Sequence, residues 1–227
     1  MINVVKSQPA PLCLAEEAKK KSGDYKCGEV LIRVRSDFHN KCYICETKAP
    51  TTINVEHFKP HKRGKLKLLK FDWNNLFYVC GHCNNTKLAK PQYDDILNCI
   101  NPDNRIVDLI EHIFDPLKSD SPDFKAQIQT QIVLNTVALL EEVYDGKTVL
   151  KKIEAENIID ALTKEMNNFV YYATGYLKSD DNPQEKRDFY ELIVAKLKPE
   201  TAFTAFKIWV VKSSPKLLKE FAQYLPQ

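Results

Sequence analysis

The most regular pattern in the chain lies in its second half, where apolar residues, with one threonine among them, recur at every third or fourth position. Such spacing places side chains on one face of an α-helix. The first series runs through Ile128, Ile132, Thr136, Leu139 and Val143. The second consists of Ala155, Ile158, Leu162, Met166, Phe169, Ala173 and Tyr176, and SDDNP follows it. The pattern predicts two long amphipathic helices, the second ending at SDDNP.

Shorter helices are predicted beyond this break, over residues 185–198, 200–212 and 215–224. Pro199 and Pro215 lie close to the predicted starts of the last two, where proline is favoured. The turn-rich sequence KSDSPDF, after Asp115-Pro116, precedes the whole helical part. We therefore expect residues 116–227 to form an all-α region.

The first half of the chain has no comparable period. Residues 1–24 contain two prolines and then AEEAKKKSGD, which predicts an extended arm and a short solvated helix, a candidate partner-binding segment. Residues 26–39 predict either a helix or a strand. Residues 42–87 mix short β-type runs with glycine and asparagine, as in a small unit organised by a metal ion. The expected fold class is α+β, mostly α, with an arm (1–24), a metal-organised module (25–115) and the helical region (116–227).

Hydrophobicity limits the environment of the protein. Hydrophobic residues make up 44% of the 227 positions, enough for a core. No stretch approaches the roughly 20 apolar residues needed to span a bilayer. We therefore expect no membrane association and a cytoplasmic location.

The charge is distributed unevenly. The net charge is +3, but residues 41–90 hold ten Lys/Arg and three Asp/Glu, a local charge of +7, so the remainder carries 3 − 7 = −4. A concentrated positive charge favours a polyanion such as nucleic acid as a partner of this segment.

Four of the seven cysteines form two matched pairs, Cys42 with Cys45 and Cys80 with Cys83, in the pattern C-x2-C-x34-C-x2-C. Each pair can supply two thiolates from one tight turn, and four thiolates complete a closed tetrahedral Zn²⁺ shell. A closed shell holds a fold and leaves no position for catalysis. The remaining Cys13, Cys27 and Cys99 lack such pairing and are expected to be ordinary semi-buried cysteines in a reducing compartment.

The residues around the cysteine pairs form a further pattern. The segment VEHFKPH is followed by a basic stretch and then by NNLFYVCGHCNNTK. This arrangement resembles the HNH nuclease superfamily, which places an acid-His pair, an Asn five residues before a C-x-x-C, His or Asn directly after it, and then a Lys. The matching residues are Glu56-His57, Asn75, Asn84 and Lys87.

The resemblance implies a ββα-metal nuclease module and a role for each residue. His57 would be the general base, a task suited to its titration range. Asn75 would orient the His57 ring or the local backbone. Glu56 and Asn84 would bind a catalytic ion, and their hard oxygen ligands indicate Mg²⁺ or Mn²⁺. The family often has histidine at the last position, so Asn84 makes this an H-N-N variant.

A basic run follows the proposed base and contains no acidic residue. The alternative is a solvated loop, but the position of the run favours binding to substrate phosphates. The residues expected to bind nucleic acid are Lys59, His61, Lys62, Arg63, Lys65, Lys67, Lys70 and Lys87. No base-reading motif is evident, so DNA and RNA, for example tRNA, both remain possible substrates. His82 is an alternative metal ligand but is expected to be exposed, and His39 and His112 have no identifiable partner.

Within the superfamily, CYICE, VEHFKPH and WNNLFYVCGHCNNTK resemble the PtuB proteins of Septu and retron-associated antiphage systems. This resemblance implies a PtuA-like ATPase as partner and, in retron systems, a reverse transcriptase with its RNA-linked DNA (msDNA). It also implies a nuclease that is held inactive until phage infection. The alternative from another class is a non-catalytic zinc-ribbon adaptor between an ATPase and nucleic acid.

Overall fold

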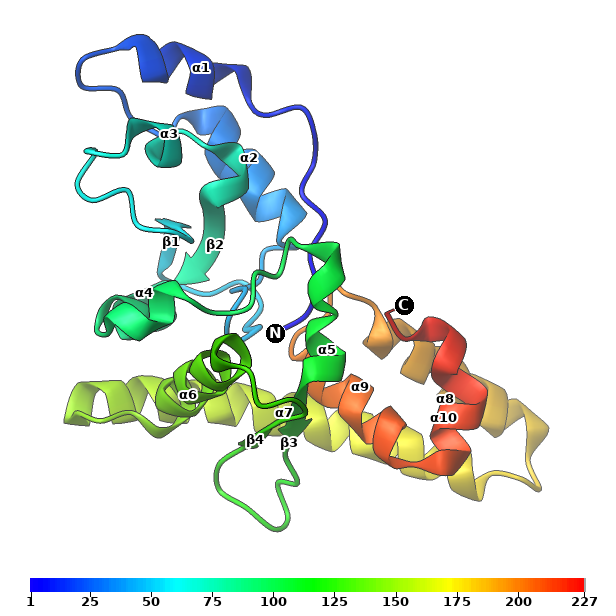
Figure 1. Cartoon of the computed structure of the whole chain (residues 1–227). Coiled ribbons are helices and arrows are strands. Elements are labelled where there is room, and N and C mark those ends of the chain that lie inside the picture. The colour runs from blue at the N-terminus through cyan, green and yellow to red at the C-terminus, as the bar shows by residue number, and fades with distance from the viewer. Residues whose placement is uncertain (227) are drawn as a thin grey trace.

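The computed structural model describes residues 1–226 and has a mostly helical α+β fold with two small antiparallel sheets (Figure 1). The first half contains α1 (Leu12–Lys19), α2 (Gly28–Asp37), β1 (Ile53–His57), α3 (Lys67–Lys70), β2 (Leu76–Cys80) and α4 (Gly81–Leu88). The second half contains α5 (Ile106–Leu109), β3 (Ile110–Ile113), β4 (Asp123–Ala126), α6 (Gln131–Asp145), α7 (Val149–Lys178), α8 (Pro183–Leu197), α9 (Thr204–Ser213) and α10 (Pro215–Phe221). The predicted class, α+β and mostly α, is confirmed.

The first sheet and α4 form a compact ββα unit. Strands β1 and β2 pair antiparallel, with Glu56 opposite Phe77 and His57 opposite Leu76. Residues 58–75 form the long connection between them, and α4 starts directly after β2. Residues 26–39, which the sequence left open between helix and strand, contain α2, which packs against β2.

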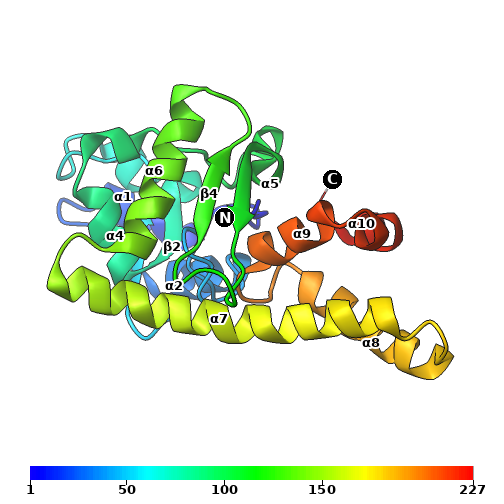
Figure 2. The same ribbon diagram turned by 90° about the horizontal axis from the view of Figure 1, so that it is seen from below.

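The two long amphipathic helices are present as α6 and α7. All seven residues of the second apolar series are buried along α7, which is 30 residues long and extends beneath both halves of the molecule (Figure 2). Helix α6 begins at Gln131, so Ile128 lies before it and is 44% exposed. Gly146, whose φ of 61° suits a residue without Cβ, ends α6.

The three shorter helices are also present, but one start differs. Pro183 and Pro215 occupy the first turns of α8 and α10, as proline prefers. Helix α9 begins at Thr204 rather than at residue 200. The intervening residues form a turn in which the backbone N–H of Phe203, at φ 51°, donates to the carbonyl of Glu46 (3.3 Å).

The region after residue 115 is not entirely helical, so that prediction is corrected. Residues 123–126 form β4, which pairs antiparallel with β3 and places Phe124 opposite His112. The KSDSPDF sequence therefore belongs to a hairpin, and its last two residues open β4. Four-residue strands are too short to give a detectable sequence period. The hairpin brings Phe124 into the main core, which also includes residues of β1, β2, α6 and α7.

The N-terminal arm is extended as far as α1, as predicted. Met1, Ile2 and Val4 are buried in the core. The Lys6 ammonium lies over the Trp73 ring at 3.5 Å and donates to the carbonyls of Trp73 and, at 2.6 Å, Leu76. These contacts attach the arm to the ββα unit, and its role in partner binding stays a prediction.

Cys13 and Cys27 form a disulfide between α1 and the N-terminus of α2, with their sulfur atoms 2.07 Å apart. The prediction that they are unpaired, ordinary semi-buried cysteines is therefore wrong, because α1 folds back beside α2. The disulfide also weakens the cysteine-based argument for a reducing compartment. Cys99 is free and fully buried. No helix within residues 1–226 has the length and hydrophobicity needed to cross a membrane.

Candidate functional site

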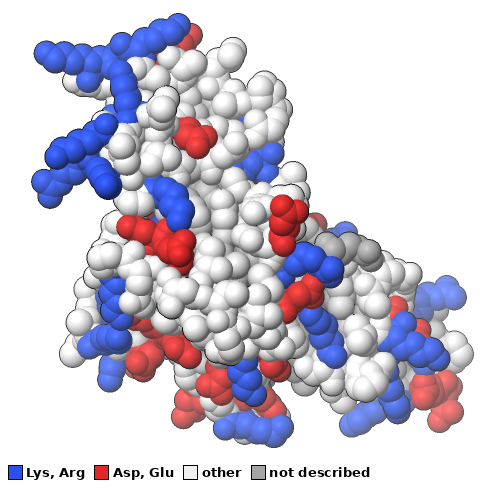
Figure 3. Space-filling model, in the orientation of Figure 1, with Lys and Arg blue, Asp and Glu red and all other residues white. Residues whose placement is uncertain are grey.

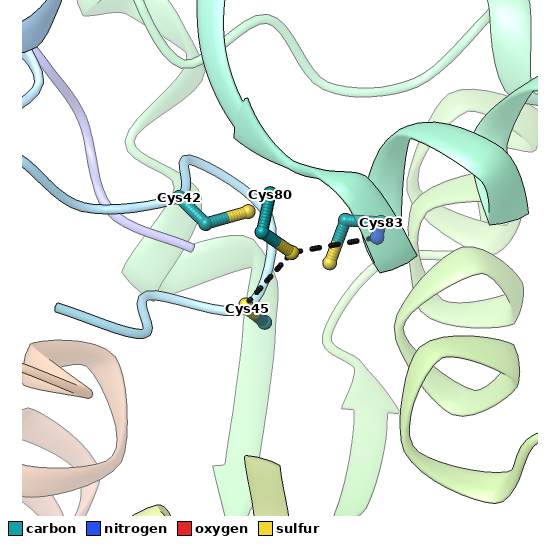
Figure 4. A group of neighbouring side chains, drawn as sticks. All are labelled: Cys42, Cys45, Cys80 and Cys83. Carbon is teal, nitrogen blue, oxygen red and sulfur yellow. Dashed lines mark hydrogen bonds between the residues drawn. The ribbon is translucent and has the colours of Figure 1, made fainter. Parts of the chain in front are cut away.

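The four paired cysteines converge on one point. Figure 4 shows Cys42, Cys45, Cys80 and Cys83 as neighbours, and their Sγ atoms all lie within 4.8 Å of one another. All four residues are buried. Tetrahedral Zn–S bonds of about 2.3 Å place sulfur atoms about 3.8 Å apart, and the Sγ atoms of Cys45 and Cys80 are 4.0 Å apart. The cluster therefore has the chemistry and the spacing to hold one structural metal ion such as zinc.

Two tight turns present these sulfur atoms. The first is closed by the Cys42 N–H, which donates to the carbonyl of Thr47 (3.1 Å), and by the Glu46 N–H, which donates to the carbonyl of Cys42 (2.9 Å). In the second, Cys80 ends β2 and the N–H of Cys83 donates to its Sγ (3.4 Å). A metal ion here would join the loop of residues 42–47 to the start of α4.

His57 ends β1 and is half-buried. Its Nε2 lies 3.0 Å from the carbonyl oxygen of Lys70, which can only accept, so Nε2 carries the proton and Nδ1 is free to accept one. The rings of Tyr25 and His61 flank it at 4.3 and 4.2 Å between centroids. Burial lowers the pKa of His57 to about 4. The imidazole is therefore neutral at pH 7.

Asn75 is buried behind His57 and binds only backbone. Its Oδ1 accepts from the N–H of Lys59 (2.7 Å), and its Nδ2 donates to the carbonyls of Lys59 and Leu69 (both 2.9 Å). These bonds join the two ends of the loop of residues 59–70, next to the Lys70 carbonyl that orients His57. Of the two roles left open for Asn75, orientation of the backbone is therefore the one that its contacts fit.

Glu56 is 7% exposed. Its Oε1 accepts a short hydrogen bond from the Tyr43 hydroxyl and lies 3.7 Å from the Lys87 ammonium, whereas Oε2 has no partner within residues 1–226. Burial raises the pKa of Glu56 to about 7, against the opposing effect of Lys87. One carboxylate oxygen is thus held in place while the other remains available.

Three of the predicted catalytic residues line one cavity of about 390 Å³. Glu56 and His57 contribute from β1 and Asn84 from the first turns of α4, together with Lys62 and Arg63 of the basic loop. The Asn84 amide makes no hydrogen bond within the described chain. The wall of the cavity therefore carries one uncommitted carboxylate oxygen, one uncommitted amide and one neutral imidazole.

Most of the predicted basic surface is present as an exposed loop. Positive side chains project over α1 and the β1–α3 connection (Figure 3). Lys62, Arg63, Lys65 and Lys67 are exposed and have no carboxylate partner within residues 1–226. His61 closes the turn, since its Nδ1 accepts from the N–H of Gly64 (2.7 Å), whose φ is 82°.

The remaining basic residues have intramolecular partners. Lys59 lies 3.4 Å from Asp95, and the Lys70 ammonium donates to the carbonyl of Gly23 (2.6 Å). Lys87 is only 2% exposed and its ammonium donates to the carbonyl of Phe58 (3.0 Å), near Glu56. This burial and these contacts make Lys87 an internal counter-ion. Lys87 therefore does not belong with the exposed residues that were expected to bind nucleic acid.

His82 is not exposed, so that expectation is corrected. It is 6% exposed, and its ring bonds the carboxylate of Glu154 and the carbonyl of Val143, both at 2.8 Å. His82 thereby joins α4 to α6 and α7. His112, for which the sequence indicated no partner, is buried 2.9 Å from the amino group of Met1.

Two tyrosines near the candidate site were missed from the sequence. Tyr43 lies inside the first cysteine pair and orients Glu56, and Tyr25 lies against His57. The position of Tyr43 was a weak signal for a role at the site, because a residue between two metal-binding cysteines lies in a tight turn and can face the neighbouring sheet. Tyr25 carried none, because its position depends on the path of the loop between α1 and α2.

The chain was also compared with known proteins. No protein-family model matches it, and a search of curated proteins finds no match.

Proposed function

We propose that the protein is a metal-dependent HNH-type nuclease that hydrolyses phosphodiester bonds. The observation that supports this most directly is the shared cavity of Glu56, His57 and Asn84. The order β1, loop, β2, α4, with a four-cysteine cluster at the β2–α4 junction, also agrees with the ββα-metal module implied by the sequence resemblance.

His57 is the general base in this proposal. Its free Nδ1 takes a proton from a water molecule, the water oxygen forms a bond to phosphorus, and the bond from phosphorus to the leaving oxygen breaks. That oxygen then takes a proton from solvent. The hydrogen bond from Nε2 to the Lys70 carbonyl fixes the ring and its tautomer during this transfer.

Asn75 acts as a positioning residue. It is hydrogen-bonded to both ends of the 59–70 loop and does not line the cavity. By holding Leu69, it holds the adjacent carbonyl of Lys70 that orients His57. Its contribution to rate is therefore indirect.

Glu56 and Asn84 are the residues that would hold a divalent cation. The donor set fits, because a carboxylate oxygen and an amide oxygen are hard ligands of the kind that Mg²⁺ and Mn²⁺ use alongside water. When bound, such an ion supplies charge stabilisation at the phosphate and the leaving oxygen. Tyr43 and Lys87 keep the Glu56 carboxylate in place.

The nuclease is further proposed to act in an antiphage complex with a PtuA-like ATPase, and in a retron system with a reverse transcriptase and msDNA. This part depends on the sequence resemblance. An available surface is the first turn of α7, where Val149 and Leu150 are 78% and 67% exposed. Ile153, one turn further along, is 52% exposed, and contiguous exposed apolar residues are a feature of protein interfaces.

The test is cleavage of plasmid DNA, single-stranded DNA and RNA by the full chain, alone and with its ATPase, in Mg²⁺ or Mn²⁺. EDTA at modest concentration is expected to stop cleavage before zinc is lost, and added Mg²⁺ is expected to restore it. His57→Ala is expected to lower the rate by about 10²- to 10⁴-fold with unchanged melting temperature.

His112→Ala, at a buried histidine outside the candidate site, is the matched control. It removes two buried hydrogen bonds, so the melting temperature is expected to fall while the folded fraction retains cleavage. Full cleavage by His57→Ala would disprove the assignment of the base. Nucleic-acid binding with no cleavage under any of these conditions would favour the zinc-ribbon adaptor.

A further inference from the structure

A second, larger hollow of about 550 Å³ lies between α2 and β1. Its walls are mainly apolar, and three of its residues, Leu31, Ile32 and Ile53, are 42%, 71% and 50% exposed. We call this hollow the α2–β1 groove. A volume of this size is typical of sites for small ligands or single groups of larger ones.

The α2–β1 groove is continuous with the candidate active site. Lys26, Asn54 and Val55 line both hollows. Alternate residues of a strand point to the same face, so Ile53 and Val55 share the face of His57. A substrate strand held beside His57 therefore has a direct path into the groove.

Several polar side chains of the groove are uncommitted, although the Tyr78 hydroxyl donates to Asn40 Oδ1 (2.7 Å). Lys26 and Arg35 are exposed and have no carboxylate partner within the described chain. The side chains of His39 and Asn54 make no hydrogen bond within residues 1–226. Apolar walls, two free cations and two free hydrogen-bonding groups suit a ligand with a flat apolar ring and an adjoining negative charge.

We infer that the α2–β1 groove holds an unpaired nucleotide next to the scissile phosphate, which makes single-stranded or locally opened nucleic acid the preferred substrate. This inference rests on the proposed nuclease function. A base within a duplex is stacked and paired, so only a splayed base can enter such a hollow. Its base packs against the apolar walls, and Lys26 and Arg35 bind its phosphates.

The test measures binding of labelled 12-nucleotide single-stranded DNA, single-stranded RNA and blunt duplex DNA to the full-length His57→Ala protein. The single strands are expected to bind more tightly than the duplex at the same salt concentration. The double variant Ile32→Ser/Ile53→Ser removes apolar wall without changing charge. It is expected to weaken single-strand binding about 10-fold, within the range measured when the packing surface of one base is removed, and to leave duplex binding unchanged.

Val149→Ser/Leu150→Ser is the matched control, since it removes two exposed apolar residues that do not line the groove, and it is expected to change no nucleic-acid affinity. Equal affinity for single strands and duplex, with no effect of the groove variant, would overturn the groove inference while leaving the nuclease proposal intact. Absence of binding to all three nucleic acids, together with no cleavage by the wild-type chain, would overturn the nuclease proposal itself. If the groove variant weakens binding of only the single-stranded DNA or only the single-stranded RNA, the result supports the inference and identifies the sugar that the site accepts.

Discussion

The ββα unit of residues 53–88 and the helices α6–α10 are held together by different interactions. Helix α7 presents seven buried residues to its neighbours, so apolar burial maintains the helical half. In the ββα unit, β2 is also buried in the main core, but specific polar groups add to this burial, namely the cysteine cluster and the hydrogen bonds of Asn75 and Glu56. We therefore expect the helical half to tolerate the loss of a few methyl groups, and the ββα unit to be more sensitive to the loss of one of its specific polar partners.

The largest effect is expected from removal of a cysteine of the cluster. Cys80→Ser should lose zinc and give unfolded or insoluble protein, since structural zinc contributes about 10 kcal/mol or more to small modules. Elemental analysis and circular dichroism measure the two effects. Cys99→Ala, a buried cysteine outside the cluster, is the control and should retain zinc. Zinc-free wild-type protein with an intact fold would contradict this dependence on the metal.

A smaller effect is expected in the helical half. Leu162 is fully buried in α7, and Leu162→Ala should destabilise the protein by about 2–5 kcal/mol through reduced burial and the resulting cavity. Urea unfolding followed by circular dichroism measures the change, and Leu150→Ala, at an exposed site of the same helix, should change little. Loss of zinc from folded Leu162→Ala protein would show that the two halves do not differ in this way.

The exposed basic loop should affect binding and not stability. Replacing Lys62, Arg63, Lys65 and Lys67 by Ala should reduce the slope of log affinity against log salt by about 0.7 to 0.9 for each phosphate that is no longer neutralised, or up to about three units. A binding titration at several salt concentrations measures the slope. The control replaces four exposed basic residues of the helical half, Arg187, Lys198, Lys216 and Lys219. Equal effects of both variants would mean that the loop is only a solvated surface.

The last effect concerns pH. Burial lowers the pKa of Lys6 from its ordinary value of 10.5 to about 7. Between these values the unfolded chain keeps a proton that the folded chain releases, so this group makes the protein more stable as pH rises from about 7 to 10.5. Below pH 7, Lys6 is protonated in both the folded and the unfolded chain, so folding bears the full free-energy cost of burying the ammonium group. The urea midpoint of wild type, minus that of Lys6→Met, should therefore increase with pH across this window, and a constant difference would contradict the proposed burial effect.

The sequence predicted the features that depend on regular spacing. The apolar series of α7 and the paired cysteines were both readable because helices and metal sites require fixed separations. It did not predict the β3–β4 hairpin, whose strands have four residues each, or the disulfide between Cys13 and Cys27. It also missed the burial of His82 and Lys87, because these depend on contacts with residues distant in sequence.

The boundary between domains was even harder to predict from the sequence. Residues 116–227 looked separable because of their helical apolar period, yet Phe124, Val133 and Leu140 are part of the same core as Val55 and Phe77. Deleting that region would expose the packing surface of the ββα unit. The sequence showed a change in period at this point, but a change in period need not coincide with a gap in the core.

Helix α7 is long enough to act as one rigid element. Thirty residues at 1.5 Å each make it about 45 Å long, so a tilt of about 5° about its middle moves each end by about 2 Å. One end carries Glu154, which holds His82 two residues before Asn84, and the other packs against α8. One continuous helix therefore connects the surface that packs against α8 with the helix that carries Asn84.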